Sequence, residues 1–301
     1  MKISINELRK VKGIGKKTIE RIKKQVRDDN YISEYNKDLH LDNNSINLGD
    51  CLNLMNGIKD KSIDMVLCDL PYNITQCEWD SIIDLDKLWL QYERIIKDNG
   101  AIVLTACQPF TTELINSNIN MFKHDWVWEK SRAGNGVIAR YEPLKYHEQV
   151  IVFGKGKIKY NPQGIIEVNR KATQGGKSSE IMKGIERETE YMQKYTNYPS
   201  TIQKFKNVGN TIHPTQKPVE LFKYLIKTYT NKGGLVLDNT SGSGVTAISS
   251  ILTNRDYICI EKEKEYYDKS VMWRDLVDSD RLMNYEEAMK AVKEEFDKRS
   301  D

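Results

Sequence analysis

The sequence predicts an α/β protein in which a mixed, mostly parallel sheet is flanked by helices and preceded by a small helical module. Residues 235–261 follow a strand, glycine turn, helix, strand pattern, which is the βαβ unit of parallel sheets. Residues 62–68 form a mostly apolar run, as expected for a strand that is covered on both faces. The 301 residues, 39% of them hydrophobic, allow one substantial domain with an accessory piece.

The first 27 residues are strongly basic, with ten lysines and arginines against two acidic residues, although the whole chain has a net charge of only +3. Apolar residues at helical spacing on both sides of a Gly-Ile-Gly turn predict two short helices joined by a hairpin. The segment resembles a helix-hairpin-helix motif, which implies contacts to the DNA backbone from Gly13, Gly15, Lys16, Lys17 and Thr18. A hairpin for oligomerisation is the alternative. We assign residues 1–28 to this module and residues 29–42 to a linker.

The main domain, residues 43–277, is predicted to open with a strand at residues 46–48, a Gly49-Asp50 turn and a helix that begins near Cys51. By itself, a Gly-Asp pair is a common turn and helix cap.

The next strand ends in Asp69-Leu70-Pro71-Tyr72. Pro71 fixes its own φ and biases Leu70 toward an extended conformation, so the Leu70 carbonyl is held in a fixed direction. The Asp69 carboxylate and this carbonyl are two acceptors that can converge on one amino group, and Tyr72 offers a stacking surface for a flat ring. The arrangement suits the exocyclic amine of a nucleobase. For the tetrapeptide alone, an ordinary proline turn with a capping aspartate is the alternative.

The middle of the chain predicts an amphipathic helix at residues 89–97 and a strand at residues 100–105. Residues 125–130 and 147–153 are expected to form the last pair of strands in the sheet. Residues 154–212 change in character, with few apolar residues and eleven lysines and arginines against five acidic residues. Such a charge-rich stretch either contacts a nucleic acid or forms a solvated loop.

The hexapeptide His213-Pro214-Thr215-Gln216-Lys217-Pro218 precedes a predicted helix at residues 219–229. Pro218 is placed to start that helix, and Lys217 can reach a carboxylate. A proline-rich loop without a ligand is the alternative for the hexapeptide in isolation.

The βαβ unit has an acidic residue at the end of each of its strands, Asp238 and Glu261. Gly242 and Gly244 allow the backbone to approach a ligand at the helix N-terminus, and Glu261 can bind both hydroxyls of a ribose. The pattern therefore predicts an adenosine-containing cofactor. The same glycines also fit the dinucleotide fingerprint of hydride-transfer enzymes, but in those enzymes this unit usually opens the fold.

Taken together, residues 69–72, 213–218 and 235–244 resemble the β-class DNA amino-methyltransferases, the N6-adenine/N4-cytosine family, over roughly residues 39–273. The family signature is Asp/Asn/Ser-Pro-Pro-Tyr/Phe, from which Leu70 departs. The resemblance implies a Rossmann-like S-adenosylmethionine-dependent methyltransferase fold with permuted motif order and a target-recognition region at residues 154–212.

The resemblance also implies roles for individual residues. The catalytic residues would be Asp69, Leu70, Pro71 and Tyr72. The residues that bind S-adenosylmethionine would be Asp50, Cys51, His213, Lys217, Pro218, Asp238, Gly242, Gly244 and Glu261.

The predicted activity is site-specific transfer of a methyl group from S-adenosylmethionine to N6 of an adenine flipped out of double-stranded DNA. Asp69 favours adenine because the cytosine-N4 enzymes of the family more often have serine at that position. An N4-cytosine methyltransferase and a catalytically weak DNA-binding protein of the same fold are the alternatives.

Several classes of protein and site are not expected from this sequence. The five cysteines form no C-x-x-C pair and the four histidines are scattered, which argues against a metal site and against disulfides. No apolar run is long enough to span a membrane and no signal peptide opens the chain, so we expect a cytoplasmic protein. Residues 278–301 predict a charged helix that docks on the domain or on a second subunit, which leaves a homodimer possible.

Overall fold

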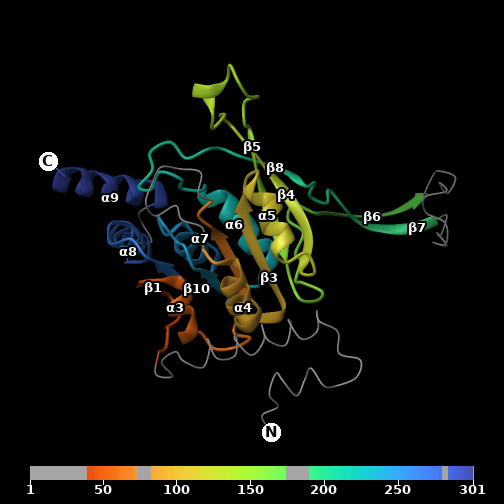
Figure 1. Ribbon diagram of the computed structural model, residues 1–301. Helices are drawn as coiled ribbons and strands as arrows, with labels where there is room; N and C mark the ends of the chain where they lie inside the picture. Colours follow the sequence, from red (N-terminus) through yellow and green to blue (C-terminus); the bar gives the residue numbers. More distant parts are fainter. Residues whose placement is uncertain (1–38, 73–82, 174–189, 280–283, 301) are drawn as a thin grey trace, which may run out of the picture.

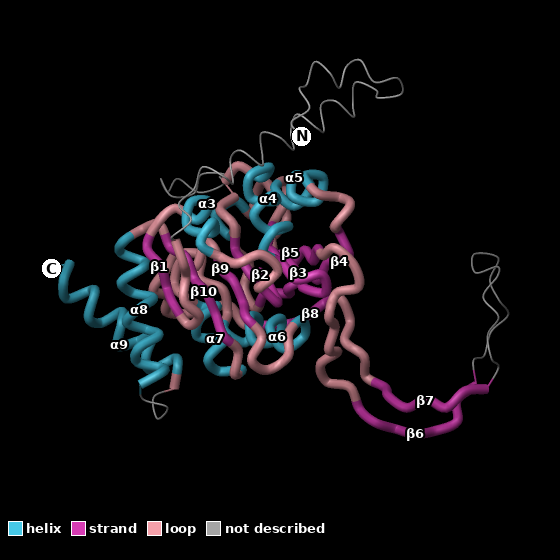
Figure 2. Tube along the Cα trace, turned by 90° about the horizontal axis from the view of Figure 1, so that it is seen from below, coloured by secondary structure: helices cyan, strands magenta, loops and turns pink. Residues whose placement is uncertain are grey.

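The computed structural model describes residues 39–72, 83–173, 190–279 and 284–300. Its central feature is an eight-stranded sheet (Figures 1 and 2). The strand order is β1 (Ser45–Leu48), β10 (Asp256–Glu261), β9 (Leu235–Asp238), β2 (Ile63–Asp69), β3 (Ile96–Ala106), β5 (His147–Phe153), β4 (Phe122–Lys130) and β8 (Ile202–Phe205). The first five strands in this order, β1, β10, β9, β2 and β3, are parallel to one another. Strand β5 is antiparallel to both of its neighbours, and β8 is parallel to β4. The predicted mixed, mostly parallel sheet is confirmed.

Helices cover both faces of the sheet, as Figure 2 shows. One face carries α3 (Cys51–Leu54), α4 (Leu85–Ile95) and α5 (Phe110–Ser117), and the other carries α6 (Val219–Tyr229), α7 (Val245–Thr253) and α8 (Lys264–Ser279). Strand β2 shows why both faces are covered, because Val66 packs with the first helix layer and Met65 and Leu67 pack with the second.

The C-terminal helix α9 (Tyr285–Ser300) docks on its own domain. Ala288 and Val292 are fully buried beside α8, and Trp273 Nε1 of α8 donates to the Tyr285 carbonyl at 2.9 Å. The apolar stripe expected at residues 278–301 is therefore covered by this chain, which was one of the two predicted outcomes.

Two expectations about the middle of the chain need correction. The helix expected at residues 89–97 ends at Ile95, and β3 begins at Ile96, so Lys97 lies in a strand. Strands β4 and β5 are not the last pair, because β8 adds to the sheet beyond β4. Pairing with an edge strand requires only backbone groups, so the short sequence of β8 does not predict this pairing.

The region after β5 also contains a two-stranded antiparallel ribbon, β6 (Ile166–Thr173) and β7 (Glu190–Thr196). It projects away from the body of the molecule in both ribbon views (Figures 1 and 2). Within the part of the chain that the structure describes, no helix is long and apolar enough to cross a membrane.

Candidate active site

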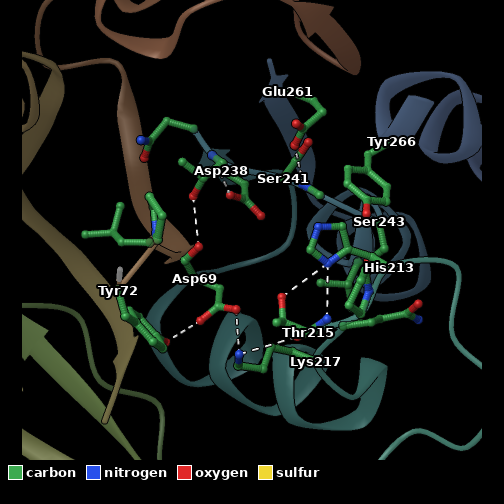
Figure 3. Close-up of a pocket in the computed structure, with 18 of the residues that line it drawn as sticks. Asp69, Tyr72, His213, Thr215, Lys217, Asp238, Ser241, Ser243, Glu261 and Tyr266 are labelled. Atoms are coloured by element: carbon green, nitrogen blue, oxygen red, sulfur yellow. Dashed lines mark hydrogen bonds and ion pairs between the residues drawn. The ribbon is translucent and has the colours of Figure 1, made fainter. Parts of the chain in front are cut away.

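A cavity of about 650 Å³ opens at the carboxyl ends of β2, β9 and β10 (Figure 3). This is where parallel α/β sheets usually bind ligands, because the loops that follow adjacent strands diverge there. Residues from all four predicted segments line it, namely those around Asp50, Asp69, His213 and Asp238.

Asp69 ends β2 and is held from three sides. The hydroxyls of Tyr72 and Thr105 both donate to Asp69 Oδ1, and Thr105 lies directly opposite Asp69 on β3. The Lys217 ammonium donates to Asp69 Oδ2 at 2.5 Å. The orientation of this carboxylate is therefore fixed by a strand neighbour, its own turn and the segment before α6.

The turn after Asp69 places the other predicted residues against the core. Leu70 is buried, and the Tyr72 ring packs against Phe110 with centroids 5.2 Å apart. Burial, followed by the nearby Asp69 charge, raises the pKa of Tyr72 well above its usual value, so its hydroxyl stays protonated and donates. Thr240 Oγ1 donates to the Asp69 carbonyl at 3.1 Å and ties this turn to the glycine turn after β9.

Asp238, at the end of β9, is 2% exposed, and its hydrogen-bond donors among the described residues are neutral. The Thr246 hydroxyl donates to Oδ2 at 2.5 Å and the Thr240 backbone N–H to Oδ1 at 3.1 Å. Burial is the main cause that raises the pKa of Asp238 to about 7. The Asp238 carboxyl group therefore titrates near neutral pH.

Glu261, at the end of β10, is held in the same manner. Its carboxylate accepts from the backbone N–H of Gly242 at 2.6 Å and from that of Glu263 at 2.8 Å. Burial raises its pKa although these donors oppose the shift. The glycine turn and the end of β10 are thus locked together around an acidic group that lines the cavity.

The two glycines of the turn have different surroundings. Gly242 lines the cavity with φ +50°, and a Cβ on it would lie 3.3 Å from Cδ2 of the His213 ring. Gly244, with φ +82°, is not part of the cavity lining, and a Cβ there would lie 2.8 Å from Ser270 Cβ on α8. Glycine at position 244 therefore serves the close approach of α7 to α8.

Asp50 and Cys51 line the cavity at the start of α3, where Asp50 caps the helix by accepting from the Asn53 N–H at 3.1 Å. Burial raises the pKa of Cys51 to about 11, which keeps its thiol protonated. Pro218 lies behind the cavity lining at the N-cap of α6.

The segment before α6 contributes a histidine and a lysine with different partners. His213 is buried against Tyr266, with ring centroids 4.2 Å apart, and burial lowers its pKa to about 4. The His213 ring is therefore neutral. Lys217, which the resemblance placed with the cofactor, lies between the carboxylates of Asp69 and Glu148 on the catalytic side.

Sequence reasoning missed part of this site. Glu148 on β5 and Lys130 on β4 form an ion pair in the cavity wall, and Thr105 and Tyr266 also contact predicted residues. The available signal was the charged side chains at the end of the predicted strand 125–130 and at the start of the predicted strand 147–153. Gly13, Gly15, Lys16, Lys17 and Thr18 lie outside the described residues. Among the described residues, no group of three or more His, Cys, Asp or Glu side chains is arranged to hold a metal ion.

Comparison with known proteins agrees with this architecture. A solved PvuII DNA methyltransferase, described as cytosine-N4-specific, superposes with a TM-score of 0.57 at 16% identity, over 84% of this chain and 93% of that chain. The crystal structure of an M1.HpyAVI complex with S-adenosylmethionine gives a TM-score of 0.52 at 21% identity, over 75% of this chain and 96% of that chain. These likenesses concern the fold.

Sequence comparison reaches further. The type II methyltransferase M2.MboI of Moraxella bovis is 27% identical over 253 residues, which are 76% of this chain and 86% of that protein. The DNA adenine methyltransferase YhdJ of Escherichia coli (strain K12) is 28% identical over 237 residues, 72% of this chain and 78% of that protein. The model of the N6/N4 DNA methylase family matches residues 63–272, which include every strand of the sheet but β1 and all of the catalytic and glycine turns, so this chain belongs to the DNA methylase family.

Proposed function

We propose that this DNA methylase transfers the methyl group of S-adenosylmethionine to N6 of an adenine flipped out of double-stranded DNA. The observation that carries the proposal is the Asp69 carboxylate, which three donors orient at the wall of the cavity. Asp238 and Glu261 line the same cavity and are available to a cofactor. The family contains adenine-N6 and cytosine-N4 enzymes, so the choice of adenine rests on Asp69 at the first position of the motif.

The residues around the cavity fit the cofactor. Its volume of about 650 Å³ lies within the 300–1,000 Å³ that is typical of small-molecule sites. Among the described residues, neither Asp238 nor Glu261 has a lysine or arginine partner, which leaves both carboxylates for a ligand. We assign Glu261 to the ribose hydroxyls and Asp238 to the amino group of the methionine moiety. When bound, the cofactor supplies an electrophilic methyl group on a positively charged sulfur.

The catalytic turn acts on the acceptor amine. The lone pair of an exocyclic amine is delocalised into the base, which makes it a poor nucleophile. Hydrogen bonds from its two N–H groups to the Asp69 carboxylate and the Leu70 carbonyl favour a pyramidal nitrogen with an available lone pair. An N–CH3 bond would replace the S–CH3 bond of the cofactor, and the Asp69 carboxylate stabilises the positive charge that the nitrogen gains. The nitrogen then gives its surplus proton to the Asp69 carboxylate, from which it passes to solvent.

Two further segments are assigned to DNA. Base flipping is required because the amine is otherwise paired inside the stack, and Tyr72 offers a surface for the extruded base. We assign residues 154–212, which include the projecting β6–β7 ribbon, to target recognition. We assign residues 1–28 to phosphate contacts, which contribute affinity without sequence information.

The test is incubation of the full chain with methyl-labelled S-adenosylmethionine and unmethylated genomic DNA, followed by nucleoside analysis. The expected product is N6-methyladenine, and sequencing the product DNA would give the recognition site. N4-methylcytosine would overturn the assignment of the base. Absence of labelled nucleoside, with DNA binding retained, would favour a catalytically weak DNA-binding protein.

A further inference from the structure

Four charged side chains form a continuous row beside the catalytic turn. The Lys217 ammonium lies 2.5 Å from Asp69 Oδ2 and 3.5 Å from Glu148 Oε2, and the Lys130 ammonium pairs with Glu148 Oε1. Figure 3 shows the Lys217 side chain directed at Asp69. The signs alternate along the row, from Asp69 through Lys217 and Glu148 to Lys130, and we call these residues the charge row.

The charge row is largely removed from water. The exposed side-chain fractions are 19% for Asp69, 6% for Lys217, 15% for Glu148 and 12% for Lys130. Solvent therefore screens these charges weakly, and each one acts strongly on its neighbours. Burial opposes the charged form of Lys217, but Asp69 and Glu148 outweigh it and raise the pKa, so Lys217 remains an ammonium.

Glu148 is directed at the lysines and not at the backbone. Its Oε2 atom is buried without a hydrogen bond and has the Lys217 ammonium as its ion-pair contact. Burial raises the pKa of Glu148, but Lys217 and Lys130 together lower it below its usual range, so Glu148 is ionised. An ionised group whose ion-pair partners among the described residues are both lysines is suited to an electrostatic role.

The reaction explains why a second carboxylate is useful here. Positive charge moves to the target nitrogen as the methyl group arrives, so the charge of Asp69 is needed at that moment. An ammonium paired with Asp69 alone would cancel much of this charge. A second carboxylate on the opposite side of Lys217 divides the attraction of the ammonium between two acceptors.

We propose that Glu148 is a positioning residue for methyl transfer, which holds Lys217 between two carboxylates so that Asp69 keeps its orientation and its negative charge toward the target amine. This inference rests on the proposed function, because it takes Asp69 as the acceptor of that amine. In this proposal Glu148 acts on the reaction through Lys217.

The first test is Glu148→Gln, which preserves shape and removes the charge. Single-turnover methyl transfer should slow by about ten-fold, the size expected for coupling within a contacting charge network. The Kd for S-adenosylmethionine, measured by calorimetry, should remain within about two-fold, because the cofactor carboxylates are not part of the row. Glu129→Gln is the matched control, since Glu129 lies on β4 beside the row but pairs with the exposed Lys204 at 2.9 Å.

The second test separates an electrostatic role from support of the fold. If Glu148 acts through Lys217, the double variant Glu148→Gln/Lys217→Met should transfer methyl faster than Glu148→Gln alone, because the cancelling ammonium is gone. The inference would be overturned if the loss of rate in the double variant equalled the sum of the losses in Glu148→Gln and Lys217→Met. A wild-type rate in Glu148→Gln would also overturn it. Should Glu148→Gln fail to fold by circular dichroism, Glu148→Asp, which keeps the charge and shortens its reach, carries the same expectation of slower transfer with cofactor binding retained.

Failure of this inference is distinguishable from failure of the proposed function. If Asp69→Ala remained active, the assignment of Asp69 to the amine would fall, and the role of Glu148 would fall with it. If Asp69→Ala were inactive and Glu148→Gln fully active, only the role of Glu148 would be wrong.

Discussion

The cavity has two acidic sides that are held in different ways. On the catalytic side, Asp69 and Glu148 are paired with buried lysines. On the side of the glycine turn, Asp238 and Glu261 accept from backbone N–H groups and a threonine hydroxyl, and no ion pair to either carboxylate occurs among the described residues. The protein thus balances the charge of one pair internally and leaves the charge of the other pair unbalanced.

The proposed function explains this difference by what each side would receive. A ligand that brings its own amino group can supply the missing cation to Asp238, which offsets the burial that raises the pKa of that carboxyl. At Glu261, whose pKa burial also raises, the ribose hydroxyls of the ligand would donate hydrogen bonds and bring no charge. The target base is neutral until it reacts, so the carboxylates beside it need cations from the protein. Carboxyl groups with a raised pKa and no lysine partner therefore mark the proposed cofactor side, whereas carboxylates paired with lysines mark the proposed catalytic side.

The largest effect that would test this comparison is expected from Asp69→Ala. Methyl transfer should fall by at least about 100-fold, as for the loss of a preorganised group that stabilises transition-state charge. Cofactor Kd should change by no more than a few-fold, because Asp69 belongs to the other side. Single-turnover assays and calorimetry on one preparation measure both quantities. A parallel loss of cofactor binding would show that the two sides do not act separately.

On the cofactor side, Glu261→Gln should raise the Kd for S-adenosylmethionine by about 10–100-fold, since a charge-assisted hydrogen bond contributes about 1.5–3 kcal/mol. The rate of transfer at saturating cofactor should change little. Glu265→Gln is the control, because Glu265 is exposed and pairs with Lys269 outside the cavity. Equal effects of the two substitutions on the Kd would remove Glu261 from the ribose.

The pH dependence of cofactor binding should be set by Asp238 on the cofactor side. The pKa of Asp238 in the free protein is raised to about 7, and its ionised form is the one that binds a cation. Affinity should therefore be fully present above pH 7 and fall as the pH decreases, by up to about ten-fold per unit. Calorimetry from pH 5.5 to 8.5 measures the slope. Asp238→Asn should bind weakly at every pH with a flat profile, and a wild-type slope in that variant would assign the titration elsewhere.

The smallest effect is expected from Tyr72→Phe. Asp69 retains Thr105 and Lys217 as donors, so loss of the Tyr72 hydroxyl should change transfer by only about two- to five-fold, which is less than the full value of a hydrogen bond to a charged group. Tyr72→Ala also removes the stacking ring and should weaken retention of the flipped base by about 1–3 kcal/mol. Fluorescence of 2-aminopurine at the target position measures this retention. Equal losses in the two variants would contradict a stacking role.

Sequence reasoning worked best where structure is local. The strand, turn and helix around Asp238 lie within about a residue of their predicted positions, because glycines and apolar periodicity specify them directly. Lys217 was expected to reach a carboxylate, but its partner Asp69 lies 148 positions away. Glu148 was not predicted, since the packing of β3, β5 and β4 brings it to Lys217, and no short motif encodes that approach.

The ribbon and edge strand after β5 were missed for a related reason. The polar composition of residues 154–212 was compatible with either target recognition or a solvated loop, and Ile202–Phe205 carries only a weak strand pattern. Its pairing with β4 depends on backbone groups that every sequence possesses.

The order of strands in the sheet determines how long each strand waits for its partner while the chain is being synthesised. Strands β2 to β5 lie between residues 63 and 153, so four adjacent strands of the sheet are synthesised before β8, β9 and β10. Asn47 of β1 contacts Cys259 of β10 across 212 positions, and Met65 of β2 pairs with Val236 of β9 across 171 positions. At about 5–20 residues per second, the partner of β1 emerges about 10–40 s after β1 itself. Until β9 emerges, the edge of β2 at Met65 and Val66 is also unpaired on the nascent chain, and a chaperone that binds extended apolar strands can act on it there.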